Sequence, residues 1–254
     1  MTSSLDANQY APREIRKYEG IYGRHFVSPG GEACARDCVA RLALGKGDSV
    51  LDVGSGLGGS AFLMAREYGA RVHGIDLSAN MIALAIARCR EEKLEDLVRF
   101  TCGDCLDLAA SQIYQAIYSR DVILHIEDKL RLFETLRQAL VPGGRLLFTD
   151  YCRSEGSAGE EFESYVAERE YHLYSLAGYH QCLREAGFVD IVSEDWTARF
   201  ITIHRQELDQ LPATGLSADD EAELRQGWQK KIARAERGEQ RWGYFTARRD
   251  QLAA

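Results

Sequence analysis

The sequence lacks an excess of positive charge, a long apolar segment and an apolar leader. Its 254 residues include 31 Lys and Arg against 39 Asp and Glu, which gives a formal net charge of −8. A protein that follows a nucleic-acid backbone needs a basic face, so we expect no nucleic-acid partner. No apolar run approaches the ~20 residues that span a bilayer, and residues 1–20 contain no apolar core typical of a signal peptide. These absences predict a soluble, cytoplasmic protein without a membrane partner.

The sequence also lacks a set of metal ligands at conventional spacing. Cys102 and Cys105 have CxxC spacing, but no second CxxC and no HxxxH motif completes a four-ligand site. The cysteines number seven, an odd count without the compact framework of a small secreted protein. We therefore expect no bound metal, unpaired thiols and a reducing compartment.

Short apolar segments alternate with stretches of helical spacing over the first three fifths of the chain. The apolar segments predict five strands, at residues 48–54, 70–78, 97–104, 115–121 and 145–151. Helical spacing predicts helices at residues 31–44, 59–68, 79–93 and 127–140. Strands that alternate with helices in this way predict an α/β fold, with a mostly parallel sheet and helices on both faces.

The alternation stops after residue 151. Polar helical stretches are expected at residues 157–172 and 176–187, and a long charged helix at residues 217–240. Between them, "FVDIVSED" (188–195) and "ARFITIH" (198–204) are interpreted as the two strands of a β-hairpin. We predict one domain over residues 1–254, with four parts: an N-terminal lid (1–30), a cofactor-binding core (31–151), a helical cap (152–187), and C-terminal strands and helix (188–254).

A glycine-rich turn follows the first predicted strand. In "LDVGSGLGG" (51–59), Gly54 and Gly56 belong to a GxGxxG pattern between a strand and a helix. Glycines in that setting let the backbone turn tightly and approach a bound nucleotide. Asp76 ends the second strand about twenty residues further on, where a carboxylate binds a ribose diol. Asp104 ends the third strand, from which it could reach an adenine amino group.

Two cofactors compete for this turn. The pyrophosphate of a dinucleotide would lie over the helix N-terminus, where the acidic Asp52 would repel it. S-adenosylmethionine has no phosphate and carries a positive amino group and a sulfonium, so Asp52 favours S-adenosylmethionine. The alternative for each single carboxylate is a helix N-cap or a solvated turn residue. Carboxylates at three successive strand ends favour the cofactor site.

The segment "RDVILHIEDK" (120–129) follows the fourth predicted strand and contains a lone histidine, His125. Its polar ends are interpreted as facing ligands, while the apolar residues between them seat the turn against the core. A histidine at this strand end is a candidate general base. The alternative is a structural histidine at a helix N-terminus that bonds to nearby backbone, and the residues alone leave both interpretations open.

The chain resembles the phosphoethanolamine N-methyltransferases of parasites, nematodes and plants, a family of class I S-adenosylmethionine-dependent methyltransferases. The matching stretches lie between about residue 8 and residue 246 and include "YEGIYG" (18–23), "VLDVGSGLGG" (50–59), "HGIDLSANM" (73–81), "IYSRDVILHI" (117–126) and "QRWGYF" (240–245). The last two are far more specific than the glycine pattern. The resemblance implies a Rossmann-like core, N-terminal lid helices and a helical cap after strand five. With its one domain the chain is similar to the short protozoan form, and a monomer is implied.

The resemblance also implies the reaction. Phosphoethanolamine, or its mono- and dimethyl forms, would be methylated on nitrogen toward phosphocholine. The free amine has a pKa of roughly 10, so it must lose a proton before it attacks a methyl carbon. His125 is expected near this amine, with Tyr10 of the N-terminal lid as its hydrogen-bonded partner. Asp121 is expected to hold and orient the cationic amine.

Two sets of binding residues are carried over from the family. S-adenosylmethionine is expected to contact Val27, Ser28, Gly54, Asp76, Leu77, Asp104, Cys105 and Arg120, together with Asp52 and Gly56 of the glycine-rich turn. The phosphobase is expected to contact Gln9, Tyr18, Asp121, Tyr151, Tyr165, Arg169, Tyr171 and Lys231. Tyrosine hydroxyls and an arginine fork suit phosphate oxygens, and simple packing of the aromatics in the cap is the alternative. Family members often have Ile at the Cys105 position, where an apolar contact makes the exchange a small one.

Three rival functions are compatible with the same core. A methyltransferase for another small amine, such as glycine, would not need Tyr165, Arg169 and Lys231. An NAD-dependent oxidoreductase would bind NADH rather than S-adenosylhomocysteine. A non-catalytic partner domain would have lost a catalytic residue, and no such loss is seen at Tyr10, Asp121 or His125.

Overall fold

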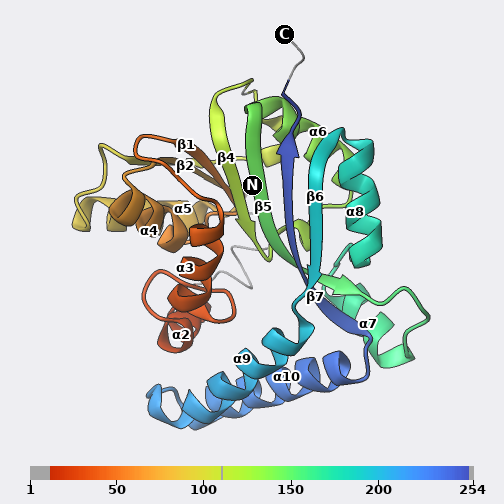
Figure 1. Ribbon diagram of the computed structural model, residues 1–254. Helices are drawn as coiled ribbons and strands as arrows, with labels where there is room; N and C mark the ends of the chain where they lie inside the picture. Colours follow the sequence, from red (N-terminus) through yellow and green to blue (C-terminus); the bar gives the residue numbers. More distant parts are fainter. Residues whose placement is uncertain (1–11, 110, 252–254) are drawn as a thin grey trace.

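The computed structural model describes residues 12–109 and 111–251, and its centre is one seven-stranded sheet (Figure 1). The strand order is β3-β2-β1-β4-β5-β7-β6. The strands are β1 (Ser49–Val53), β2 (Arg71–Asp76), β3 (Val98–Cys102), β4 (Tyr114–Arg120), β5 (Leu140–Arg153), β6 (Phe188–Asp195) and β7 (Gln240–Arg249). The first five pair in parallel, whereas β7 runs antiparallel to both β5 and β6. The predicted mostly parallel α/β sheet is confirmed.

Helices cover both faces of the sheet because the buried strands are apolar on both sides. Successive strand residues point to opposite faces. Val50 joins an apolar cluster with α3 (Gly31–Arg41) and α4 (Gly59–Tyr68), whereas Leu51 joins a second cluster with α6 (Lys129–Ala139) and α8 (Leu176–Glu185). Another helix, α5 (Ala79–Glu91), is capped by Ser78, whose side chain accepts a hydrogen bond from the Met81 amide, as is typical of an N-cap residue.

A second group of helices lies beyond the carboxyl ends of the parallel strands (Figure 1). These are α2 (Pro12–Tyr22), α7 (Glu160–Glu168), α9 (Thr197–Gln210) and α10 (Ala218–Glu236). Three short 3₁₀ turns, η1 (Cys105–Asp107), η2 (Ile123–His125) and η3 (Leu211–Ala213), complete the described elements. No helix within the described residues is long and apolar enough to cross a bilayer.

The predicted C-terminal β-hairpin is wrong. The segment 198–204 is part of the helix α9, and β6 instead pairs with β7, which follows α10. The buried residues of α9 include Phe200, His204 and Glu207, which are spaced as one helix face. The β-branched residues Ile201, Thr202 and Ile203 gave this segment a high strand propensity, and packing of the helical face against α10 and β7 overrode it.

Candidate active site

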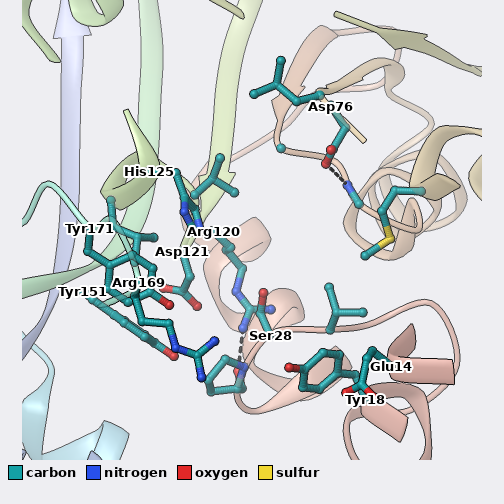
Figure 2. Close-up of a pocket in the computed structure, with 18 of the residues that line it drawn as sticks. Glu14, Tyr18, Ser28, Asp76, Arg120, Asp121, His125, Tyr151, Arg169 and Tyr171 are labelled. Atoms are coloured by element: carbon teal, nitrogen blue, oxygen red, sulfur yellow. Dashed lines mark hydrogen bonds between the residues drawn. The ribbon is translucent and has the colours of Figure 1, made fainter. Parts of the chain in front are cut away.

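A cavity of about 280 Å³ opens at the carboxyl ends of the parallel strands. Its walls come from the segments that follow β1 to β5 and from α2, α7 and α10. All the described residues predicted for the site, except Asp52, line this cavity: Tyr18, Val27, Ser28, Gly54, Gly56, Asp76, Leu77, Asp104, Cys105, Arg120, Asp121, His125, Tyr151, Tyr165, Arg169, Tyr171 and Lys231. Figure 2 shows Asp76 on one side and a cluster around Asp121, His125 and Arg169 on the other. The predicted residues Gln9 and Tyr10 lie outside the described part of the chain.

The glycine-rich turn is held in place by Asp76. Gly54 and Gly56 have φ angles of 69° and 52°, in the left-handed region that favours glycine. The amide of Gly56 donates to one carboxylate oxygen of Asp76 at 2.9 Å, and the amide of Ser78 donates to the other at 2.9 Å. A carboxylate oxygen accepts more than one hydrogen bond. Asp76 is therefore fixed by backbone while it still faces the cavity.

Asp52 lies behind the cavity wall rather than in it. Its side chain is only 2 % exposed, and one of its oxygens has no hydrogen-bond partner within the described residues. Burial raises the pKa of this carboxyl to about 7, with a further rise from Asp76 and an opposing effect of Arg120. The structure therefore does not bring Asp52 together with the other predicted cofactor residues at the cavity surface.

Asp104 and Cys105 form the wall at the end of β3. Asp104 is the N-cap of η1, and its side chain accepts a hydrogen bond from the Leu106 amide at 2.8 Å. It therefore combines the capping role considered as an alternative with a place in the cavity lining. Burial raises the pKa of the Cys105 thiol to about 12, so this side chain is a neutral, largely apolar surface at physiological pH.

Arg120 fastens the segment that leads into α3. Its guanidinium is buried and donates to the carbonyl oxygens of Pro29 at 2.6 Å and Gly31 at 3.2 Å. This segment carries Val27 and Ser28, which line the cavity. Arg120 thus shapes the cofactor side of the cavity through backbone contacts as well as lining it.

Asp121 presents one free carboxylate oxygen. Its backbone has a φ of 55°, which is unusual for a residue with a side chain. Oδ1 accepts hydrogen bonds from Thr149 Oγ1 at 3.0 Å and from Trp242 Nε1 at 2.8 Å. Oδ2 is buried and has no partner within the described residues. A carboxylate fixed through one oxygen, with the other one unsatisfied in a cavity, suits a cationic amine.

His125 ends the η2 turn beside Tyr171. The two rings meet edge to face, with centroids 5.2 Å apart. Burial lowers the pKa of His125 to about 4, with further lowering by Lys129, His172 and Arg169, so the imidazole is neutral at physiological pH. No hydrogen bond joins the ring to backbone among the residues described here, although the backbone amide donates to Val122 O at 3.0 Å. This geometry favours the general-base interpretation over a structural histidine.

The far end of the cavity carries cations without carboxylate partners. Lys231 Nζ lies 3.4 Å from the Tyr151 hydroxyl and 5.4 Å from the centre of that ring. Burial lowers the pKa of Lys231 to about 8. In the described part of the chain, neither Lys231 nor Arg169 has a carboxylate within ion-pair distance. A partly buried lysine and an exposed arginine, both without a counter-ion at that distance, suit an anion.

Tyr165 lines the same cavity from α7. Its ring lies edge to face with that of Tyr171 at 5.7 Å, and the guanidinium of Arg234 stacks 3.7 Å from its centre. Arg234 is buried and pairs with Glu161 at 3.1 Å. Arg234 therefore supports Tyr165 from behind, and the sequence analysis did not single it out.

The sequence analysis also missed the contacts that hold α2 over the cavity. Lys17, which lines the cavity, is 4 % exposed and pairs with Glu14 at 2.9 Å, Glu223 at 3.0 Å and Asp220 at 3.5 Å. Arg13 adds a 2.9 Å ion pair with Asp220. The pairs with Asp220 and Glu223 join α2 to α10, about two hundred residues away, so no local pattern in the sequence indicates them.

The chain is similar to known methyltransferases. A family model described as a methyltransferase domain matches residues 25–193. The chain is 41% identical to phosphoethanolamine N-methyltransferase 1 of Zea mays, over 96% of this chain and 50% of that protein. It is 34% identical to the phosphoethanolamine N-methyltransferase of Plasmodium falciparum, over 96% of this chain and 94% of that protein. The chain thus spans about half the length of the plant relatives and nearly the whole length of the Plasmodium protein.

The chain is also similar to solved structures of methyltransferases. Phosphoethanolamine N-methyltransferase 2 of Haemonchus contortus, in complex with phosphomonomethylethanolamine and S-adenosylhomocysteine, matches with a TM-score of 0.93 and 34% identity. That match covers 97% of this chain and 60% of the Haemonchus chain. A sarcosine dimethylglycine methyltransferase from Galdieria sulphuraria has a TM-score of 0.75 at 21% identity, which indicates a shared fold only.

Proposed function

The chain belongs to the phosphoethanolamine N-methyltransferase family, and on that basis we propose that it transfers methyl groups from S-adenosylmethionine to the nitrogen of phosphoethanolamine. The mono- and dimethyl forms are included in the proposal, with phosphocholine as the final product. The observation that carries it is one cavity lined by three kinds of residue. These are Asp76 and Asp104 at the strand ends, Asp121 and His125 after β4, and Lys231, which lies beside Tyr151 and has no carboxylate within ion-pair distance among the described residues.

The residues on the strand side fit an adenosyl group. Asp76 is anchored by backbone amides at the end of β2, where a carboxylate suits a ribose diol. Asp104 and the neutral thiol of Cys105 would border the adenine, and Leu77, which is 51 % exposed, adds apolar surface. When bound there, S-adenosylmethionine supplies an electrophilic methyl group. Arg120 keeps Val27 and Ser28 against the same ligand through its hydrogen bonds to Pro29 and Gly31.

The middle of the cavity handles the charge and the proton of the acceptor amine. Asp121 Oδ2 would hold the ammonium, because this oxygen has no other partner among the described residues. The neutral imidazole of His125 would accept the proton that leaves the nitrogen. Arg169 is one of the charges that lower the pKa of His125. A phosphate bound to Arg169 would offset that charge and raise the pKa of His125, so the substrate would strengthen its own base.

The far end of the cavity would bind the phosphoryl group. Lys231 and Arg169 supply positive charge, and the hydroxyls of Tyr151, Tyr165 and Tyr171 supply further donors. The role of Tyr10 as hydrogen-bonded partner of His125 stays a prediction from the family resemblance.

We infer one methyltransferase domain, because the lid, core, cap and C-terminal segments each contribute to the cavity wall. All seven cysteines are unpaired, which supports a reducing compartment such as the cytoplasm. The monomer stays a prediction from the family resemblance.

A methyl-counting assay tests the proposed function. Purified protein and S-adenosylmethionine are incubated with phosphoethanolamine, its monomethyl and dimethyl forms, ethanolamine or glycine, and products are quantified by mass spectrometry. We expect at least one phosphobase to exceed ethanolamine in kcat/KM by ~10²-fold or more, because bonds from charged groups to the phosphate would be lost. Equal methylation of glycine or ethanolamine would favour a general small-amine methyltransferase. Binding of NADH instead of S-adenosylhomocysteine in calorimetry would favour an oxidoreductase.

A further inference from the structure

Lys129 is a fully buried lysine in an unfavourable place. Its side chain is 0% exposed, and it is the first residue of α6. Burial disfavours a charged ammonium, and the positive end of a helix dipole disfavours a cation there as well. No carboxylate lies within ion-pair distance of Lys129 in the described residues, and it does not line the cavity. A residue that is costly on both counts requires a compensating interaction.

The compensating interactions lie on both sides of His125. Lys129 Nζ donates to the carbonyl oxygens of Ile123 at 2.9 Å and Ile126 at 2.6 Å. Ile123 begins the η2 turn and Ile126 follows its last residue, His125. Leu124, His125 and Ile126 line the cavity, whereas Lys129 does not. The ammonium therefore ties together the two ends of the turn that carries the imidazole.

A carboxylate and two tyrosines complete the surroundings of Lys129. Its ammonium lies 5.1 Å from the centre of the Tyr174 ring and 5.7 Å from that of Tyr179. Tyr179 donates a hydrogen bond from its hydroxyl to Asp150, which is also 0% exposed. Burial raises the pKa of Asp150 to about 8, and the amide of Leu124, inside the turn, interacts with this carboxyl group and opposes the rise. The turn thus lies between a buried cation that binds its carbonyls and a buried carboxylate that attracts its amide.

We propose that Lys129 is a positioning residue, which fixes the η2 turn and so sets the reach of His125 toward the acceptor nitrogen. This inference rests on the proposed methyl transfer, because it assigns His125 to that reaction. Lys129 itself touches neither the cavity nor a ligand. Its positive charge has a second effect, because it adds to the burial that keeps the His125 imidazole neutral.

The direction of this electrostatic effect follows from the groups around each side chain. His125 faces the positive charges of Lys129 and Arg169, together with His172. Lys129 faces Asp150 and the thiols of Cys152 and Cys182. Removing the Lys129 charge is therefore expected to raise the pKa of His125. A loss of packing without a loss of charge gives no reason for the pKa to rise.

Lys129→Met tests the proposal, with Arg249→Met as a matched control. Arg249 is another buried cation that donates to backbone carbonyls, those of Arg137 and Gln138 in the last turn of α6 and of Leu140 directly after it. These contacts lie at the opposite end of α6 from Lys129. We expect Lys129→Met to lower kcat by ~10–100-fold through misplacement of the imidazole. The KM for phosphobase and the affinity for S-adenosylhomocysteine should change by less than about two-fold. Arg249→Met should lower thermal stability without that selective loss of kcat.

A second readout is independent of activity. The ring signals of His125 are followed by NMR against pH without substrate, and are assigned with a His125→Gln variant. We expect Lys129→Met and Lys129→Gln to raise the pKa of His125 and Arg249→Met to leave it unchanged. Lys129→Gln keeps a donor for a carbonyl, so it should recover part of kcat while the pKa shift remains.

An unchanged kcat and an unchanged His125 titration in folded Lys129→Met would overturn the proposal. If Lys129→Met does not fold, the same two results in Lys129→Gln decide it. A lower kcat together with a higher KM and a weaker cofactor affinity would also contradict a positioning role, since it indicates that the whole site is disrupted. If the wild type methylates no phosphobase, the proposed function fails, and the NMR titration still decides whether Lys129 controls the imidazole.

Discussion

Replacing His125 with alanine is expected to lower turnover on phosphobases by ~10²–10⁴-fold, the usual effect of removing a general base. The acceptor amine is an ammonium at neutral pH, and the neutral imidazole is the group at the middle of the cavity that can take its proton. Initial rates with each of the three phosphobases would measure the loss. The affinity for S-adenosylhomocysteine should stay within about two-fold, because His125 lies on the side of the cavity away from Asp76.

The matched control for this prediction is His180→Ala. His180 is also partly buried, but its ring bonds to Ser193 Oγ at 3.1 Å and does not line the cavity. We expect near-normal turnover from that variant. Near-normal turnover from His125→Ala on all three substrates would remove His125 from the mechanism, and Asp121 would then be the remaining candidate base.

The second large effect is expected at the anion site. Lys231→Met should raise the KM for phosphobase by ~10²-fold, because a bond between a partly buried ammonium and a phosphate is lost. The affinity for S-adenosylhomocysteine should not change. Arg169→Met should act in the same direction but less strongly, since Arg169 is exposed at the end of α7.

Lys230→Met is the control for the anion site, because Lys230 is the exposed neighbour on the same helix. The melting temperature of the Lys231→Met variant gives an additional test. Lys231 lies partly buried with no counter-ion among the described residues, so its replacement by methionine should maintain or raise the melting temperature without phosphobase. An unchanged KM in Lys231→Met, or an equal loss with ethanolamine as substrate, would show that the phosphoryl group binds elsewhere.

The core of the fold was predictable because its signals are local. The five parallel strands and the helices between them follow the change from short apolar runs to helical spacing, and each was found near its predicted position. The error at residues 198–204 arose where β-branched residues occupy a helix whose burial depends on distant elements. The strand β7 was hidden for the same reason, because its partners β5 and β6 lie far away in the sequence.

Site residues were predictable where the topology of the sheet brings them together. They were not predictable where their role depends on a single contact in the folded structure. Parallel strands bring their carboxyl ends to one edge, so Asp76, Asp104 and Asp121 meet in one cavity. Asp52 was predicted to line the cavity as well. The lining begins one residue later, at Val53, and Asp52 is buried behind it. Lys129 binds backbone carbonyls and Lys17 binds a distant helix. Neither role has a local signature in the sequence.

The central claim is that one cavity holds a nucleoside at the strand ends and an aminoalkyl phosphate beside it. A crystal structure of the protein with S-adenosylhomocysteine and phosphoethanolamine tests this claim most directly. We predict that the phosphoryl oxygens contact Lys231 and Arg169, while the nitrogen lies between Asp121 Oδ2 and the His125 ring and faces the sulfur. A phosphoryl group bound away from Lys231 and Arg169, or an imidazole turned away from the nitrogen, would contradict the account.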